Sequence, residues 1–221
     1  MLAKDLVSDS IPRVMTSNTG AQALSWMEHF RVSHLPVVNE ADFLGLISDA
    51  DISTLTNPDE PIGNHNLSLF SPFVFLDQHL YEVAEIMARL NLSVVPVLNP
   101  QKSYAGCITQ QEMIGAFARL AGVDQPGAVI ILNMTIHDYS LFEISRLVEE
   151  NGAKILSLFA STSPETMRLE LTIKVNTTDL TSINRSLERY GYEISASFSH
   201  EDAMEELYRS RFDEFMRYLN T

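Results

Sequence analysis

The chain has 221 residues, a formal net charge of −14 and 45% apolar residues. This length allows one large domain or two small ones, and the composition is typical of a globular protein. Residues 1–125 hold 6 basic and 14 acidic residues and residues 126–221 hold 9 and 15, so the charges of −8 and −6 are spread evenly. Because no basic stripe is present to neutralise phosphates, neither nucleic acid nor an anionic membrane is expected as a partner.

The N-terminal residues and the cysteine content predict a cytoplasmic protein. Residues 1–9 lack the positive flank and apolar stretch of a signal peptide, and no apolar run reaches the roughly 18 residues that span a bilayer. Cys107 is the single cysteine, so no disulfide framework can form within one chain. A reducing compartment suits such a chain.

Two phrases of the sequence occur twice. Ser33–Asn39 (Ser-His-Leu-Pro-Val-Val-Asn) matches Ser93–Asn99 (Ser-Val-Val-Pro-Val-Leu-Asn), 60 residues later. Gly45–Ile52 (Gly-Leu-Ile-Ser-Asp-Ala-Asp-Ile) matches Gly106–Met113 (Gly-Cys-Ile-Thr-Gln-Gln-Glu-Met), 61 residues later. Two copies are too few for a solenoid. They predict two similar units packed against each other, with a pseudo-twofold axis and two related clefts.

Each copy is predicted to run strand, helix, strand, strand, helix. The first copy has an extended segment over 11–15, a helix capped by Asn18 or Thr19 that runs to about Val32, strands over 35–38 and 43–47, and a helix opened by Ser48. The second copy has strands over 73–76, 94–98 and 104–108, and helices over about 80–90 and 109–120. Short strands that alternate with helices indicate an α/β (α+β) layer architecture.

A different pattern follows the Gly- and Pro-containing boundary over 121–127. The elements predicted there are a strand over 128–134, a helix over 140–151, strands over 154–161 and 166–175 joined by a turn around Pro164, a helix capped by Asp179 that runs to Tyr190, and a strand over 192–198. This β-α-β-β-α-β order is that of a ferredoxin-like unit. A final amphipathic helix from Ser199 to about Leu219 either docks on its own domain or forms a dimer contact.

The repeated phrases resemble a tandem pair of CBS domains. The likeness covers roughly the first 120 residues and rests on a buried Pro-Val-Val/Leu-Asn strand followed by Gly-x-Ile-Ser/Thr-x-x-Asp/Glu-Ile/Met. By its element order, the segment 128–198 resembles an ACT-type domain. A CBS pair followed by an ACT-like domain is similar in layout to the acetoin-utilisation B-type proteins, although this layout does not imply that the chain acts on acetoin.

The resemblance implies an adenine-nucleotide sensor whose paired repeats form a disc-like module and which dimerises. We place the CBS pair at 1–122, with repeat one over about 1–60 and repeat two over about 61–122. The ACT-like domain then covers 128–199 and the C-terminal amphipathic helix 200–221. The expected partners are a small-molecule nucleotide ligand, a second copy of the chain and a regulated enzyme, and no cofactor is required.

In the resembled family, the Ser or Thr of the motif lies near the ligand phosphate, and the acidic residue three positions on chelates the ribose hydroxyls. These positions are Ser48 and Asp51 in the first copy and Thr109 and Glu112 in the second. Helix N-termini offer free N–H groups to phosphate, and a carboxylate can accept from two vicinal hydroxyls. The same pairs also fit capping boxes, which stabilise a helix without any ligand. The longer Glu112 side chain caps its own helix more easily, so ligand binding is expected mainly in the first cleft.

The adenine ring is expected between apolar strands of each cleft. The residues assigned to it are Val14, Leu35 and Pro36 in one cleft and Val74, Val95 and Pro96 in the other. His34 adjoins the strand phrase and either contacts a phosphate or is a hydrogen-bonded packing residue. The nearby basic candidates for a phosphate are few: Arg13, Arg31, His34, Arg89, Lys102 and Arg119. Because they are sparse, adenosine, AMP or S-adenosylmethionine is favoured over ATP.

In ACT-type domains, the loop after the first strand and the following helix frame an amino-acid site at a dimer interface. Here that loop contains Asp138, Tyr139 and Ser140, of which Asp138 suits an amino group. The glycine common in this loop is absent. Asp138 or Ser140 alternatively caps the following helix.

No catalytic or metal-binding constellation is recognised. The six histidines show no ligand spacing, and the Gly-x-Ser-x-Gly, Walker and Gly-x-Gly-x-x-Gly patterns are absent. The sequence therefore predicts a non-catalytic, ligand-sensing regulatory protein. The alternative is a structural or interaction protein with decayed ligand sites, which dimerises and binds a partner enzyme. An enzyme of unrecognised type is the third interpretation.

Overall fold

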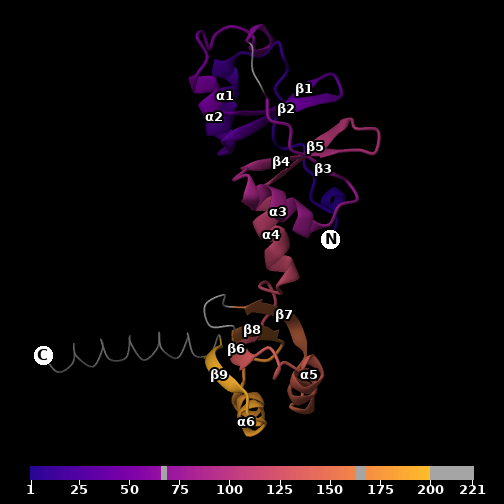
Figure 1. Ribbon diagram of the computed structural model, residues 1–221, viewed down its shortest axis with the longest axis vertical. Helices are drawn as coiled ribbons and strands as arrows, with labels where there is room; N and C mark the ends of the chain where they lie inside the picture. Colours follow the sequence, from indigo (N-terminus) through magenta and orange to yellow (C-terminus); the bar gives the residue numbers. More distant parts are fainter. Residues whose placement is uncertain (66–68, 163–167, 200–221) are drawn as a thin grey trace, which may run out of the picture. The chain divides into compact units, whose positions relative to one another are not determined.

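The computed structural model describes residues 1–65, 69–162 and 168–199 of the chain, which divides into two compact units (Figure 1). The first unit comprises Met1–Ala116 and the second begins at Phe117, so the division falls within helix α4 (Gln110–Leu120). The predicted domain boundaries stay predictions. The turn around Pro164 and the amphipathic helix over 200–221 lie outside the described residues.

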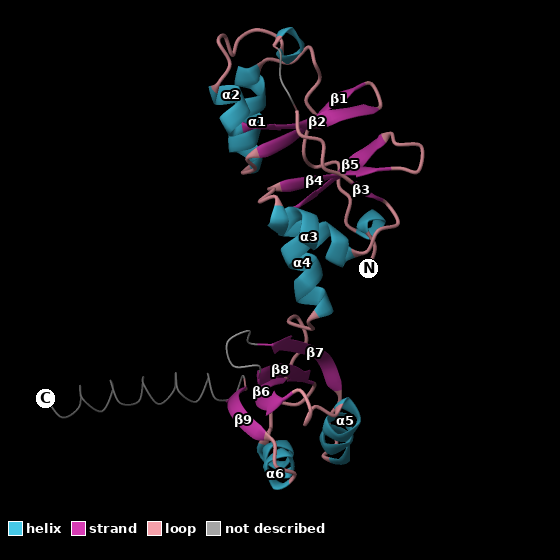
Figure 2. Cartoon of the chain, in the orientation of Figure 1, coloured by secondary structure: helices cyan, strands magenta, loops and turns pink. Residues whose placement is uncertain are grey.

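The first unit contains the same arrangement twice, as the repeated phrases predict (Figure 2). The first copy consists of helix α1 (Gly20–Phe30), the antiparallel hairpin β1 (His34–Asn39) and β2 (Asp42–Ser48), and helix α2 (Asp49–Ser53). The second copy consists of β3 (Val74–Phe75), helix α3 (Leu80–Arg89), the antiparallel hairpin β4 (Val94–Leu98) and β5 (Tyr104–Thr109), and α4. The mixed α+β fold class is confirmed.

The two copies also begin their first helices in the same way. The Thr19 side chain accepts from the Gln22 N–H at 3.2 Å, and the Gln22 side chain accepts from the Thr19 N–H at 3.2 Å. At the equivalent place before α3, the Glu82 side chain accepts from the His79 N–H at 3.0 Å, and the His79 Nδ1 accepts from the Tyr81 N–H at 3.2 Å. Reciprocal bonds of this kind satisfy N–H groups that have no partner within the helix.

The two copies are interlocked by an exchange of the segments that precede them. Ser8, which precedes the first copy, pairs with Cys107 of the second, and its N–H donates to the Cys107 carbonyl at 3.0 Å. Phe70, which precedes the second copy, pairs with Leu46 of the first, whose N–H donates to the Phe70 carbonyl at 2.8 Å. Each hairpin is therefore completed by the leading segment of the other copy.

This exchange explains the glycine at the start of the second repeated phrase. Gly45 and Gly106 have φ values of +150° and +134°, which L side chains rarely adopt. A Cβ at Gly45 would lie 2.6 Å from the Leu69 Cβ, and one at Gly106 would lie 2.7 Å from a Val7 methyl group. Both glycines are therefore required by the passing segment.

The second unit has the predicted β-α-β-β-α-β order. Its elements are β6 (Ala128–Thr135), α5 (Leu141–Glu150), β7 (Ile155–Thr162), β8 (Arg168–Val175), α6 (Thr181–Arg189) and β9 (Glu193–Phe198). The antiparallel sheet has the order β7-β8-β6-β9, and Figure 1 shows α5 and α6 on the same side of it. Alternate residues of β6 and β8 are buried, as expected for a sheet covered on one face.

One predicted helix start in this unit was displaced. Helix α6 begins at Thr181, with Leu180 as its N-cap, whereas the sequence suggested that Asp179 is the cap. The Asp179 carboxylate still accepts a hydrogen bond from the Thr181 N–H at 2.9 Å, and this bond lowers the pKa of Asp179. The Asp179 side chain therefore accepts a hydrogen bond from the first turn of α6 although Asp179 lies one residue before the N-cap.

Candidate functional site

Ser48 and Asp51 form a capping box where β2 meets α2. The Ser48 hydroxyl accepts from the Asp51 N–H at 3.1 Å. The Asp51 Oδ2 accepts from the Ser48 N–H at 2.8 Å and from the Ser48 hydroxyl at 2.7 Å. Both residues are half-buried, and the other oxygen of Asp51 accepts no hydrogen bond from the described residues. One oxygen thus stabilises the helix start while the second retains its acceptor capacity.

Thr109 and Glu112 reproduce this geometry in the second copy. The Glu112 Oε2 accepts from the Thr109 N–H at 2.7 Å and from its hydroxyl at 3.1 Å, and the Glu112 N–H donates to the Thr109 hydroxyl at 3.2 Å. Thr109 is only 9% exposed. Both carboxylates therefore fold back on their own helices alike, despite the extra methylene of Glu112. Ligand binding by either pair stays a prediction.

His34 lies beside this junction and also joins the two copies. It pairs with Ser48 across the β1–β2 hairpin, and its Nδ1 lies 3.1 Å from the Ser93 hydroxyl and 3.4 Å from the Ser93 nitrogen. Because a backbone N–H can only donate, Nδ1 acts as the acceptor and the neutral ring carries its proton on Nε2. Burial lowers the pKa of His34, although the carboxylates of Asp49 and Asp51 act in the opposite direction. The structure thus brings His34, Ser48 and Asp51 together.

The apolar residues assigned to the adenine sites belong to the core of the first unit. Val14, Leu35, Val74 and Val95 are each 0% exposed, and both strand prolines, Pro36 and Pro96, are buried. Val14 and Pro36 are neighbours, since the Val14 N–H donates to the Pro36 carbonyl at 2.8 Å. These side chains support the strands beneath the capping boxes, and their contact with a ligand stays a prediction.

Sequence reasoning missed a hollow of about 600 Å³ in the first unit. We call it the Trp26 hollow, and the residues that line it are Asp9, Ile11, Pro12, Arg13, Met15, Asn18, Trp26, Tyr104 and Ala105. None of these residues belongs to the predicted ligand set, although Arg13 is among the basic residues considered as phosphate partners. The available signal was Trp26 itself, the single tryptophan of the chain, which lies on helix α1.

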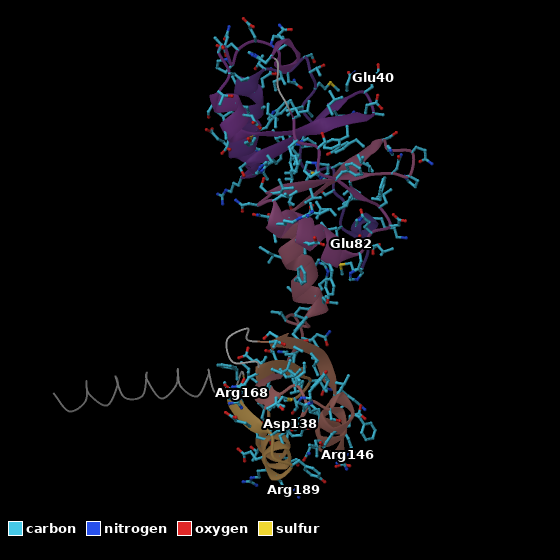
Figure 3. The ribbon with its side chains drawn as sticks, viewed as in Figure 1. Glu40, Glu82, Asp138, Arg146, Arg168 and Arg189 are labelled. Carbon is cyan, nitrogen blue, oxygen red and sulfur yellow. The ribbon has the colours of Figure 1, made fainter. Side chains whose placement is uncertain are left out.

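In the second unit the predicted effector loop contributes to another hollow, of about 490 Å³. Asp138 and Ser140 line this Asp138 hollow, whereas Tyr139 packs against the core of the unit. Ser140 caps α5, with its hydroxyl accepting from the Glu143 N–H at 3.3 Å. The Asp138 carboxylate accepts from the Thr135 hydroxyl at 2.6 Å. Figure 3 labels Asp138 and Arg168, which both line this hollow.

The Asp138 hollow has an acidic lining. Asp138, Glu143 and Glu193 contribute carboxylates, and Arg168 forms an ion pair with Glu193. The Tyr192 hydroxyl donates to Glu143 at 2.9 Å, and burial together with this bond raises the pKa of Tyr192 to about 12. A concave surface with this charge favours a ligand that carries an ammonium group.

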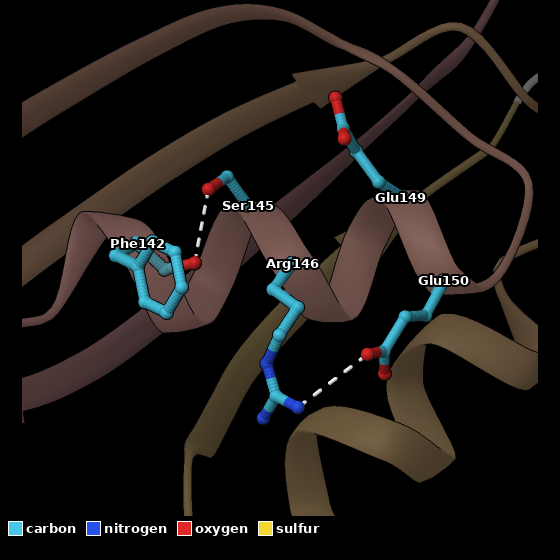
Figure 4. Close-up of a pocket in the computed structure, with 5 residues that line it drawn as sticks. All are labelled: Phe142, Ser145, Arg146, Glu149 and Glu150. Atoms are coloured by element: carbon cyan, nitrogen blue, oxygen red, sulfur yellow. Dashed lines mark hydrogen bonds and ion pairs between the residues drawn. The ribbon is translucent and has the colours of Figure 1, made fainter.

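A shallower hollow of about 390 Å³ lies on the outer face of α5 (Figure 4). Phe142 is 79% exposed there, and Arg146 forms an ion pair with Glu150 at 3.4 Å. Arg146 also lies over the Tyr190 ring, 5.3 Å from its centroid. Because exposed ion pairs one helical turn apart contribute little, these groups show an ordinary solvated helix face.

Two further features bear on chemistry. Cys107 is fully buried, and burial raises the pKa of its thiol to about 12, so the reactive thiolate is not populated at neutral pH.

Within residues 1–65, 69–162 and 168–199, no three side chains from His, Cys, Asp and Glu are grouped so that they could hold a metal ion. In the same part of the chain, every helix is too short or too polar to cross a membrane.

Comparison with known families identifies the first unit. Residues 3–55 and residues 70–119 each match the family model of the CBS domain. This part of the chain is a tandem pair of CBS domains. The match confirms the CBS pair that the repeated phrases predicted. CBS domains are regulatory, ligand-sensing modules.

Solved structures similar to this chain include other CBS pairs. The CBS domain pair/ACT domain protein from Thermotoga maritima is 20% identical, and the match covers 54% of this chain and 98% of that one with a TM-score of 0.48. CBSX2, a CBS-pair protein from Arabidopsis thaliana, matches in its complex with AMP at 20% identity, covering 53% and 96% with a TM-score of 0.46. The CBS domains of a transcriptional regulator from Streptococcus pneumoniae match at 18% identity, covering 52% and 98% with a TM-score of 0.45.

Proposed function

We propose that the chain is a non-catalytic regulatory protein whose CBS pair senses an adenine-containing small molecule, drawn from adenosine, AMP, ATP and S-adenosylmethionine. The observation that carries this proposal is the convergence of His34, Ser48 and Asp51 at the contact between the two copies. A ligand bound there would touch both copies, and so could favour one arrangement of the pair over another.

The groups at this junction suit a ribose better than a polyphosphate. The second oxygen of Asp51 can accept from a ribose hydroxyl, and the Nε2–H of neutral His34 can donate. Helix α2 carries Asp49 and Asp51 in its first turn, and these carboxylates repel an anionic group. We therefore expect adenosine or S-adenosylmethionine to bind more tightly than ATP, with AMP between them.

The second copy is proposed as the weaker site. It retains the carboxylate of Glu112, but Val94 occupies the position that His34 has in the first copy. The donor of the first site is thus replaced by a methyl-bearing side chain. Of these two junctions, only the first is therefore expected to be occupied at moderate ligand concentrations.

Calorimetry with each of the four compounds tests this proposal. The variant Asp51→Asn keeps an oxygen that can accept from the Ser48 N–H, so the helix start survives while the second acceptor is lost. We expect the affinity to fall by about tenfold or more, because a hydrogen bond to a charged group is typically worth ~1.5–3 kcal/mol. Glu112→Gln is the matched control in the other copy and should change the affinity much less.

The proposal fails if none of the four compounds produces heat or raises the melting temperature. A ligand specific for the folded state must stabilise that state by mass action. Such a result would favour the alternative of an interaction protein with decayed sites. That alternative has its own support, because both motif carboxylates already cap their own helices.

We further propose that the second unit is an ACT-like domain that binds a second effector, a small amino compound, in the Asp138 hollow. The element order, the sheet order and the acidic lining support this. Melting temperatures measured with a panel of amino acids test it, with Asp138→Asn as the variant that should remove any stabilisation. The proposed homodimer is tested by light scattering. The regulated enzyme is tested by co-purification from native cells, and the cytoplasmic location by cell fractionation.

A further inference from the structure

The Trp26 hollow combines aromatic walls with two opposite charges. The rings of Trp26 and Tyr104 are half-buried, whereas Arg13 and Asp9 are exposed at its rim. Its volume of about 600 Å³ lies within the range of small-molecule sites. It shares no residue with the junction of His34, Ser48 and Asp51. A ligand held here would therefore use a separate set of contacts.

The walls of this hollow are fixed in place by the surrounding fold. The Tyr104 ring stacks against Phe43 at 6.4 Å between centroids, and the Tyr104 N–H donates to the Ala41 carbonyl at 2.8 Å. Asn18 accepts from the Met15 N–H at 2.8 Å, which fixes the turn before α1. A pre-formed hollow of this kind needs little ordering when a ligand enters.

The two charged groups, in contrast, are available. Arg13 makes one long hydrogen bond, from Nη1 to the Glu40 carbonyl at 3.5 Å, and no ion pair within the described residues. Figure 3 labels Glu40 at the end of the β1–β2 hairpin. The Asp9 carboxylate accepts no hydrogen bond from the described part of the chain.

The repeat shows that these side chains are not required by the fold. Val14 and Val74 form equivalent parallel contacts, with Val37 and Val97. By the same alignment, the equivalents of Arg13 and Trp26 in the second copy are Phe73 and Ile86, and the equivalent of Tyr104 in the first copy is Phe43. Phe73 packs edge to face on Phe75 at 5.3 Å, as an ordinary apolar contact. The polar and aromatic set thus occurs in only one of two equivalent places.

We propose that the Trp26 hollow is a second ligand site for a planar aromatic compound that carries an amino group and one anionic group, of the class of nucleoside monophosphates. The ring stacks on Trp26 and Tyr104, since base–aromatic stacking is favourable for any base. The anionic group pairs with the guanidinium of Arg13, which suits phosphate geometry. The amino group donates to Asp9. This site goes beyond the proposed function, because it does not depend on Asp51.

Trp26 itself reports on the site, because it is the single tryptophan of the chain. Titration with AMP should change its fluorescence saturably, with excitation at the red edge of the indole band and free tryptophan amide as the control for absorption by the nucleotide. Arg13→Gln should weaken the binding by about tenfold, as should the use of adenosine in place of AMP. Inorganic phosphate alone should cause no change. Arg89→Gln, an exposed arginine of the same unit paired with Glu85, is the matched control and should bind as the unmodified chain does.

Asp51→Asn separates this inference from the proposed function. If the fluorescence change survives in Asp51→Asn and is weakened in Arg13→Gln, the second site is supported. If the change is lost in Asp51→Asn but kept in Arg13→Gln, the signal belongs to the first junction, and the second site is wrong while the proposed function stands. The second site is also wrong if neither AMP nor GMP causes a saturable fluorescence change in the unmodified chain. The melting temperature of Arg13→Gln should equal that of the unmodified chain, so that weaker binding by this variant is not due to unfolding.

Discussion

The two CBS copies share a backbone plan but differ in the side chains that surround it. Both use a capping box at the junction of strand and helix, and both place a glycine beneath the exchanged segment. They differ where His34 faces Ser93, since the equivalent of His34 is Val94, and around the Trp26 hollow. The shared glycines are required by the exchanged segments, and the shared capping boxes suit both a helix start and a ligand. The side chains that differ are therefore expected to decide which copy binds more tightly.

The largest expected effect concerns the shared glycines. Gly45→Ala and Gly106→Ala should each lower the free energy of unfolding by about 3 kcal/mol, because a Cβ at either place meets the passing segment and the backbone is left-handed. Chemical denaturation measures this. Gly152→Ala is the control, because nothing lies within 4 Å of its added Cβ, and its cost should be about 1 kcal/mol. Equal costs at all three positions would contradict the role given to the exchange.

A smaller effect is expected for the two caps. Ser48→Ala and Thr109→Ala each remove the acceptor for a first-turn N–H and should cost about 1 kcal/mol. Thr109→Ala should be the more damaging, because Thr109 is more deeply buried and loses a packed methyl group as well. Thermal melting of the two variants side by side checks this order. A larger loss of stability in Ser48→Ala than in Thr109→Ala would contradict this order. It would mean that Ser48 stabilises the fold more than its half-buried position indicates.

The dependence of stability on pH should distinguish the two copies. Because the pKa of His34 is lowered in the folded chain, the unfolded chain binds the proton more readily. The stability that His34 contributes is therefore present above its unfolded pKa of 6.5 and is lost as the pH falls below that value. His34→Val, which gives the first copy the side chain of the second, should flatten the stability curve in that window. Denaturation midpoints measured across the window decide it, and a variant whose curve matches that of the unmodified chain would contradict the assignment.

The smallest effect on ligand binding by the CBS pair is expected from a change in the second unit. Tyr192→Phe removes the hydrogen bond from the phenol to Glu143 and should cost about 1 kcal/mol. It should leave ligand binding by the first unit unchanged, since Tyr192 belongs to the other compact unit. Calorimetry on the variant with the best ligand of the CBS pair is the check. A changed affinity there would show that the two units are coupled.

The sequence predicted those features that depend on neighbouring residues. The helix starts near Thr19 and Ser48 and the end of α5 near Asn151 could be predicted, because a helix end is decided within about four residues. The CBS pair could be predicted because its phrases repeat. The predicted start of α6 was wrong by one residue, because the Asp179 carboxylate can accept from a first-turn N–H without being the N-cap.

The features that were missed depend on distant residues. The lining of the Trp26 hollow comes from segments around Arg13, Trp26 and Tyr104, and no local pattern relates them. The exchange between Ser8 and Cys107 is made by backbone groups, which every residue has. The predicted ligand residues Ser48 and Asp51 were brought together by their own capping box, so their proximity alone does not separate binding from capping.

The interlocked arrangement also has a consequence for separating the two copies. A single copy, cut from its twin, would leave its hairpin without a bordering segment and its own leading segment without a hairpin. Two separate halves could restore both pairings only by exchanging their leading segments between two polypeptides. Because the present chain carries both halves, each leading segment reaches the hairpin of the other copy within one molecule.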